Sequence, residues 1–155
     1  MPIKAIVLEQ HKKILDSAAS HVKGVAIPRE GWIVTARKAL RMSASDLAAR
    51  MNVTRASISS LERSELDGGV TLKRMERVAD AMGCRFIYAI VPESDVDSML
   101  TARAKRKARQ LVEQADQQMS LEGQRLSPEQ LDFEVERITK EILAELPRGF
   151  WSDKE

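Results

Sequence analysis

The stretch from Ala44 to Arg63 constrains the fold of this chain more than any other part of it. Its apolar and small residues recur at helical spacing in two groups, Leu47, Ala48 and Met51, then Val53, Ile58 and Leu61. Between the groups, Asn52 suits a tight turn because asparagine tolerates a left-handed backbone, and the Thr54 hydroxyl can cap the helix that follows. The pattern predicts two short helices that cross closely at Ala48, with the second group of apolar side chains buried between them.

The segments around this pair predict further helices. Before it, a helix is predicted by residues at helical spacing that form a buried face, namely Trp32 or Ile33, Ala36 and Leu40. Ser43 and Asp46 then form a capping-box-like pair where the next helix starts. After the pair, Thr71 caps a helix that ends at Gly83. The whole arrangement resembles the Xre-type, lambda-repressor-like transcription regulators, in which the second helix of a helix-turn-helix enters the major groove.

Residues 84–91, CRFIYAIV, are rich in β-branched and aromatic residues and are followed by Pro92, so they predict a short β-strand. One strand cannot satisfy its own backbone groups. The chain offers only Ile3–Leu8 as a partner, a segment that also fits a helix, so we expect antiparallel pairing with the same strand of a second copy. The pairing residues are then Arg85, Phe86, Ile87, Tyr88, Ala89 and Ile90. A two-fold axis there would place two recognition helices about 34 Å apart, one turn of DNA.

Both ends of the chain predict helical extensions. Residues 1–22 have rough helical spacing, and residues 24–31 are typical of a linker. Two helices are predicted near the C-terminus, a long one with a basic arm over residues 96–119 and an acidic amphipathic one over residues 127–146. We therefore expect a mainly α fold, a lambda-repressor-like core with one short strand and helical extensions. Its parts are an N-terminal arm and linker (1–28), a helix-turn-helix domain (29–92) and a C-terminal extension (93–155).

Two large rings, Phe150 and Trp151, lie close to the end of the sequence. Apolar side chains of this size are rarely left in solvent together. We expect them to pack on the chain's own core or on a partner.

Charge is divided unevenly along the chain. Residues 1–110 carry 20 Lys and Arg against 12 Asp and Glu, a net charge of +8, whereas residues 111–155 carry 5 against 11, a net charge of −6. A basic body attracts polyanions, and an acidic end repels DNA, contacts a basic surface or stays solvated. The basic run over residues 103–109 has five cations in seven positions, and it either lies solvated or contacts phosphates.

The leading turn of the helix that begins after Thr54 is the expected reading head. A helix in the major groove reaches base edges with its first turn or two, which gives the base-reading candidates Arg55, Ala56, Ser57 and Ser60. Arg55 can donate two hydrogen bonds to guanine, worth about 1–3 kcal/mol of discrimination. Instead of reading a base, Arg55 could contact a phosphate or form a salt bridge to an acid such as Glu62. Contacts to the DNA backbone are expected from Thr54, Ser43, Ala44, Arg37, Lys38 and Arg41.

Other chemistries find little support in the sequence. Cys84 is the single cysteine and His11 and His21 are isolated, so neither a disulfide nor a metal site is expected. Cys84 is expected to be a small core residue beside the strand. No nucleophile with a base and no phosphate-binding loop can be assembled, so we expect neither enzyme activity nor a cofactor. Without a stretch of about 20 apolar residues, we expect a cytoplasmic protein with no membrane partner.

A longer resemblance runs from Gly31 to Pro92 and continues into the basic run RAKRKAR. Over this length the chain resembles the group called mobile mystery protein A. That resemblance implies an Xre-type regulator that accompanies a Fic-domain protein, an arrangement that suggests a toxin and antitoxin pair. The first expected function is therefore a sequence-specific, repressor-like regulator that binds double-stranded operator DNA as a homodimer. The alternative is an antitoxin-like interaction module that binds the Fic-domain partner through the C-terminal extension, with or without autoregulation.

Overall fold

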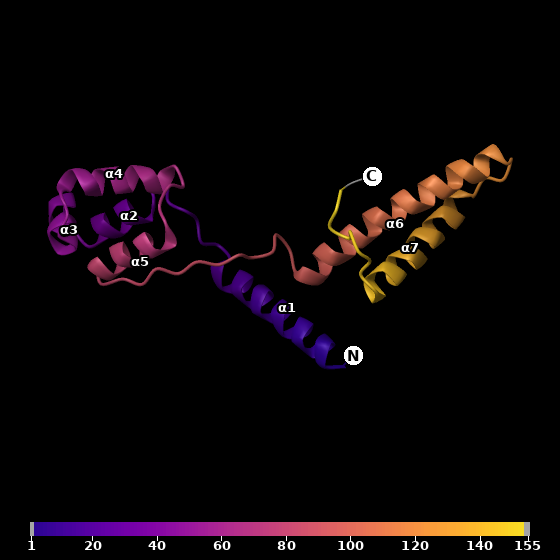
Figure 1. The fold of residues 1–155 in the computed structure, drawn as a ribbon, viewed down its shortest axis with the longest axis horizontal. Coiled ribbons are helices and arrows are strands. Elements are labelled where there is room, and N and C mark those ends of the chain that lie inside the picture. The colour runs from indigo at the N-terminus through magenta and orange to yellow at the C-terminus, as the bar shows by residue number, and fades with distance from the viewer. Residues whose placement is uncertain (1, 154–155) are drawn as a thin grey trace. The chain divides into compact units, whose positions relative to one another are not determined.

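The computed structural model describes residues 2–153, which form helices joined by turns and extended segments (Figure 1). The helices are α1 (Pro2–Val22), α2 (Trp32–Ala39), α3 (Ala44–Met51), α4 (Arg55–Leu66), α5 (Leu72–Ala81), α6 (Val96–Leu121) and α7 (Pro128–Ala144). The predicted mainly α fold is confirmed. The chain divides into two compact units, Val22–Ala89, here called the central unit, and the described residues on either side of it, here called the flanking unit. None of the described helices combines the length and the apolar content that a membrane crossing requires.

Helices α2 to α5 of the central unit pack around one small core. Its buried side chains are Ile33, Leu47, Ala48, Ile58, Leu61, Val78 and Met82. Of the two alternatives at the start of α2, Ile33 is buried and Trp32 is 44% exposed. The prediction that Leu40 is buried was wrong, because Leu40 is the residue at which α2 ends and it is 49% exposed.

The turn after α3 explains why Val53 is exposed although a buried position was predicted. Asn52 has φ 54° and ψ 47°, the left-handed conformation expected of it. The Val53 N–H donates to the Ala48 carbonyl at 2.9 Å, and the Asn52 N–H donates to the Ala49 carbonyl at 3.2 Å. This pair of bonds closes a helix at a left-handed residue. It holds Val53 at the rim of the core, where 41% of the residue is exposed.

The same motif ends α5 and accounts for Cys84. Gly83 has φ 70°, which favours glycine, and the Cys84 N–H donates to the Ala79 carbonyl at 2.8 Å. Gly83 therefore closes α5 as predicted. Cys84 is exposed, so its predicted place in the core was wrong. The cause is positional, because the closing bond holds Cys84 immediately beyond the end of the helix.

Residues 84–91 form no strand in this single chain, although a strand was predicted there. The physical reason is the one that favoured a dimer: a strand needs a partner, and the one candidate within the chain, Ile3–Leu8, lies in α1. The segment is left with exposed apolar side chains, since Ile87, Tyr88 and Ile90 are 69%, 67% and 87% exposed. Pairing of this segment with a second copy stays a prediction.

The flanking unit contains a helical hairpin in which α6 packs against α7. Its core consists of Ala104, Ala108, Val112, Val135, Ile142 and Phe150. The predicted start of α7 is confirmed, because Ser127 and Gln130 form a capping box and Pro128 occupies the first helical turn. The two rings near the C-terminus differ in burial: Phe150 is 3% exposed in the hairpin's core, and Trp151 is 62% exposed.

The basic run on α6 is used in part to hold the hairpin together. Arg103 donates from Nε to the Phe150 carbonyl at 2.9 Å and from Nη1 to Asp153 at 2.6 Å. Lys107 donates to the Ser152 carbonyl at 3.1 Å, and Lys105 pairs with Glu136 on α7 at 2.8 Å. Three of the five cations thus contact the chain itself, which neither of the two sequence interpretations foresaw.

Candidate nucleic-acid interface

The corner between α3 and α4 is built by two local devices. The first is the left-handed turn at Asn52 described above. The second is the cap of α4, where the Thr54 hydroxyl accepts a hydrogen bond from the Ser57 N–H at 3.1 Å and lies 2.9 Å from the Ser57 hydroxyl. A threonine cap satisfies one of the otherwise unpaired N–H groups at the start of a helix. Together these devices fix where the first turn of α4 points.

The first turns of α4 have one buried and one exposed side. Ile58 and Leu61 are 1% and 2% exposed in the core of the central unit. Of the predicted base-reading residues, Arg55, Ala56 and Ser60 are exposed, and Ser57 is half-buried. The core therefore holds α4 by one side and presents the other side of its first two turns to solvent.

Arg55 is free to make an external contact. Within residues 2–153 its side chain has no hydrogen bond or ion pair, and it lies at the first helical position after the Thr54 cap. The salt bridge to Glu62 that the sequence left open as an alternative does not form. Glu62 has another partner.

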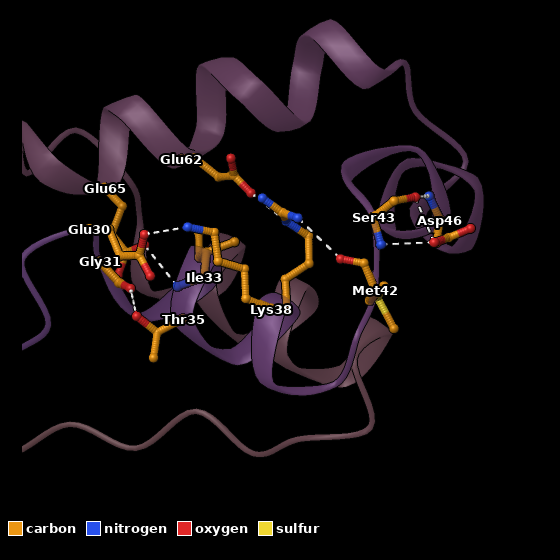
Figure 2. Close-up of polar contacts among 11 residues, drawn as sticks. Glu30, Gly31, Ile33, Thr35, Lys38, Met42, Ser43, Asp46, Glu62 and Glu65 are labelled. Carbon is orange, nitrogen blue, oxygen red and sulfur yellow. Dashed lines mark hydrogen bonds and ion pairs between the residues drawn. The ribbon is translucent and has the colours of Figure 1, made fainter.

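That partner is Arg37 on α2, one of the expected backbone contacts. Arg37 Nε lies 2.8 Å from Glu62 Oε1, and its Nη1 donates to the Met42 carbonyl at 3.1 Å. The two side chains of the pair are 14% and 15% exposed. In Figure 2, Glu62 on α4 and Met42 in the loop before α3 lie on either side of this contact. Arg37 thus fastens α2 to α4 and to the loop, and its cationic group is occupied within the fold.

The remaining expected backbone residues surround the start of α3. Lys38 pairs with Glu30 at 2.6 Å on the exposed surface. Arg41 is exposed and has φ 54°, an unusual conformation for a residue other than glycine. Ser43 is exposed and Ala44 is half-buried at the first position of α3. Arg41, Ser43 and Ala44 thus lie where α2 ends and α3 begins. Arg41 closes α2, and Ser43 caps α3.

Glu65 is a positioning residue that the sequence analysis missed. Its two carboxylate oxygens accept from the N–H groups of Trp32 at 2.7 Å and Ile33 at 3.0 Å, as Figure 2 shows for Ile33. A carboxylate at the start of a helix is stabilising because the N–H groups there are unpaired and carry partial positive charge. Gly31 leaves room for it, since a Cβ at Gly31 would lie 2.7 Å from Glu65 Oε2. The available signal was the spacing of Glu62 and Glu65, two acids one turn apart on a helix expected to approach DNA.

Asp46 makes the start of α3 sensitive to acid. Hydrogen bonds from the Ser43 hydroxyl and from the Ser43 N–H lower the pKa of the Asp46 carboxyl below its ordinary value. A lowered pKa means that the ionised cap stabilises the fold above the unfolded value, and that this contribution is lost as pH falls through the folded value. We expect the thermal midpoint of the central unit to drop below about pH 4. Asp46→Asn should flatten that dependence in melts followed by circular dichroism, and an unchanged slope would contradict it.

Tertiary structure redistributes the charge that the sequence divided at residue 110. The central unit, residues 22–89, carries 12 Lys and Arg against 7 Asp and Glu, a net charge of +5. The rest of the chain carries 13 against 16, a net charge of −3, and the two values add to the +2 of the whole. The basic run is thus part of an acidic unit, and the excess positive charge belongs to the unit that contains α3 and α4.

Comparison with known families agrees with this geometry. Residues 33–88 match the family model described as helix-turn-helix, which spans α2 to α5 and most of the extended segment after them. This part of the chain is therefore a helix-turn-helix domain, with α3 and α4 as its two crossing helices. The comparisons with curated proteins and with solved structures gave no match.

Proposed function

We propose that the protein is a sequence-specific DNA-binding transcription regulator that inserts α4 into the major groove. The observation that carries this proposal is Arg55, exposed and unpaired on the leading turn of a helix whose opposite side is fixed in the core. Arginine offers two parallel donors to guanine O6 and N7. In this proposal Ala56 touches a thymine methyl, and the Ser57 and Ser60 hydroxyls donate to or accept from base edges.

Contacts to the phosphates would come from the ends of α3 and α4. The Thr54 hydroxyl and the N–H of Ala44 lie at helix N-termini, which favour anions, and Ser43 can join them by exchanging Asp46 for a phosphate. Arg41 adds an exposed cation between α2 and α3, and Lys38 can join it by exchanging Glu30 for a phosphate. In this proposal Arg37 contacts no DNA and has only a positioning role, because it holds α2 and α4 together.

The proposed regulator binds its operator as a homodimer and acts as a repressor. The extended segment supports the dimer, because its exposed apolar side chains and unpaired backbone suit pairing with the same segment of a second copy, through residues Arg85, Phe86, Ile87, Tyr88, Ala89 and Ile90. Phe86 and Tyr88 already stack with their ring centroids 6.1 Å apart. Residues two apart share one face of a strand, so this pair would lie on the same side of the intermolecular sheet.

Selection of bound sites from a random pool of duplex DNA, at two salt concentrations, tests the proposal. We expect an inverted repeat with half-sites about one helical turn apart. Binding should weaken steeply with salt, because each phosphate contact releases counterions. Failure to enrich any sequence at either salt concentration would contradict a sequence-specific regulator.

A second proposed function is an antitoxin-like interaction through the flanking unit. It is favoured by the separate core of the α6–α7 hairpin and by two large apolar side chains that the hairpin exposes, Leu121 at 89% and Phe133 at 67%. The resemblance to mobile mystery protein A suggests a Fic-domain protein as the partner. The two functions separate in one variant: Arg55→Ala should weaken operator binding and still retain the partner in a pull-down.

A further inference from the structure

One side of α6 carries hydrogen-bond donors and no acid over about four helical turns. At 100° per residue, six side chains between residues 103 and 117 fall within a sector of about 100°, here called the donor stripe. They are three cations and three amides, namely Arg103, Arg106, Lys107, Gln110, Gln114 and Gln117. Over this length the nearest acid of α6 is Glu113, about 20° beyond one edge of the stripe, and the nearest large apolar residue is Leu111, about 40° beyond the other. Met99 and Leu121 lie beyond its two ends.

Most of the donor stripe is not used by the fold. Arg106 and the three glutamines are exposed, and their side chains make no hydrogen bond within residues 2–153. The side of α6 that packs in the core of the hairpin, through Ala104, Ala108 and Val112, lies about 150° around the helix from the centre of the stripe. Helix α7 therefore leaves the stripe open.

The segment after α7 occupies the cationic end of the stripe, and Figure 1 shows it returning toward α6. Arg103 donates from Nε to the Phe150 carbonyl and from Nη2 to the Ser152 carbonyl, both at 2.9 Å, and Lys107 donates to the same Ser152 carbonyl at 3.1 Å. The fourth bond runs from Arg103 Nη1 to the carboxylate of Asp153 at 2.6 Å. Backbone carbonyls thus orient Arg103 and Lys107, and Asp153 is the one charged group bound to them.

Asp153 is the chain's own anion at this end of the stripe. The hydrogen bond from Arg103 and the charges of Arg103, Arg106 and Lys107 lower the pKa of the Asp153 carboxyl below its ordinary value. Its side chain is nevertheless 85% exposed. Exposed ion pairs contribute little to stability. A ligand with several negative charges can therefore replace this carboxylate at little cost to the fold.

We propose that the donor stripe binds the phosphodiester backbone of a nucleic acid, which displaces the Asp153 carboxylate from Arg103. The inference goes beyond the proposed function, because it assigns a nucleic-acid contact to the flanking unit and does not involve α4. From Arg103 to Gln117 the stripe is about 21 Å long. A duplex carries one phosphate per about 3.4 Å on each strand, so this length corresponds to about six phosphates of one strand.

The composition of the stripe favours a nucleic acid over an acidic segment of a protein. Protein interfaces depend on apolar and aromatic side chains buried in desolvated pockets, and the stripe contains no apolar side chain between its first and last residues. Contacts to nucleic-acid phosphates come from Lys and Arg and from polar side chains such as Gln. These are the residue types that the stripe presents.

Trp151 provides a local reporter for this site. It is 62% exposed, and the centroid of its ring lies 6.0 Å from Arg103 Cζ. In a Trp32→Phe background Trp151 is the single tryptophan of the full chain. We expect its emission to change saturably when short random-sequence DNA is added, and the apparent affinity to fall as salt is raised. Single-stranded and duplex DNA are titrated separately, and a response to one form alone identifies the form that the stripe binds.

Lys107 and Lys105 form a matched pair for this titration. Each contacts the chain once, Lys107 through the Ser152 carbonyl and Lys105 through Glu136, but Lys105 lies on the opposite side of α6 from the stripe. Lys107→Gln should weaken binding about five- to tenfold and reduce the salt slope by about 0.7–0.9, the loss of one phosphate contact. Lys105→Gln should change little, and Lys107→Arg should restore binding.

Two further variants test the cation without a partner and the displacement. Arg106→Gln breaks no hydrogen bond of the fold, so weaker binding by this variant reports on the ligand alone. Asp153→Asn should tighten binding about two- to fivefold, because it removes the competing anion. Unchanged affinity of the Asp153→Asn chain would overturn the displacement.

The remaining outcomes decide the ligand and separate this inference from the proposed function. The donor stripe is refuted if neither form of DNA changes Trp151 emission, or if Lys105→Gln and Lys107→Gln weaken binding equally. An equal response to poly-glutamate, or to vesicles of phosphatidylcholine and phosphatidylserine, would also overturn a nucleic-acid ligand. Site selection is scored separately, so an enriched operator without a Trp151 response refutes only the stripe, and a response without an operator refutes only the regulator.

Discussion

Replacing Arg55 by alanine is expected to weaken binding to the selected operator by about 5- to 150-fold, the range that corresponds to a bidentate contact worth about 1–3 kcal/mol. Arg55 is exposed and has no partner within residues 2–153, so the substitution removes no interaction from the fold. The thermal midpoint should therefore stay close to that of the unchanged chain. A competition assay against sites altered at each position should show that preference for guanine is relaxed at one position in each half-site.

Arg148→Ala is the matched control for Arg55→Ala. It removes the same charge from an exposed arginine in the flanking unit, and we expect operator binding to change little. A uniform loss of affinity by Arg55→Ala for all sequences, with a smaller salt slope, would assign Arg55 to a phosphate. Unchanged affinity and unchanged preference would show that the leading turn of α4 is not the reading head.

The second large effect is expected from Phe150→Ala in the flanking unit. Phe150 is 3% exposed among the buried side chains of α6 and α7. Removal of a buried phenyl ring costs about 3–5 kcal/mol, because burial is lost and a cavity is left. The backbone carbonyl that accepts from Arg103 Nε is kept by alanine, so the loss reports on the ring alone. Chemical denaturation should show a lower unfolding free energy for this unit.

The neighbouring ring gives the control for that experiment. Trp151 packs edge-on against Phe150 with the centroids 5.0 Å apart, yet it is 62% exposed. Trp151→Ala should therefore cost much less than Phe150→Ala, near the scale of about 0.5–1.5 kcal/mol for one aromatic pair. The central unit has its own core, so neither substitution should alter operator binding at temperatures where the flanking unit stays folded. Equal destabilisation by both would mean that the rings act as one cluster.

Local sequence determined the devices that begin and end the helices. Asn52 at the turn, the Thr54 and Thr71 caps, the Ser43 capping box and the closing Gly83 all occur where the residue types predicted them. These devices act within a few residues, through one side chain and nearby backbone groups, so they need no knowledge of the rest of the fold. The same is true of the apolar spacing that predicted α4 and its buried residues Ile58 and Leu61.

Tertiary structure alone decided which charges remain available. Arg37 and Arg55 look alike in the sequence, but Glu62 and the Met42 carbonyl occupy Arg37 and leave Arg55 free. The cations at residues 103–109 read as one arm, yet three of them bind the C-terminal segment or α7. Whether residues 84–91 become a strand depends on a partner that a single chain does not supply. In each case the deciding group is distant in sequence, or belongs to another molecule, and only the folded arrangement brings it within hydrogen-bonding distance.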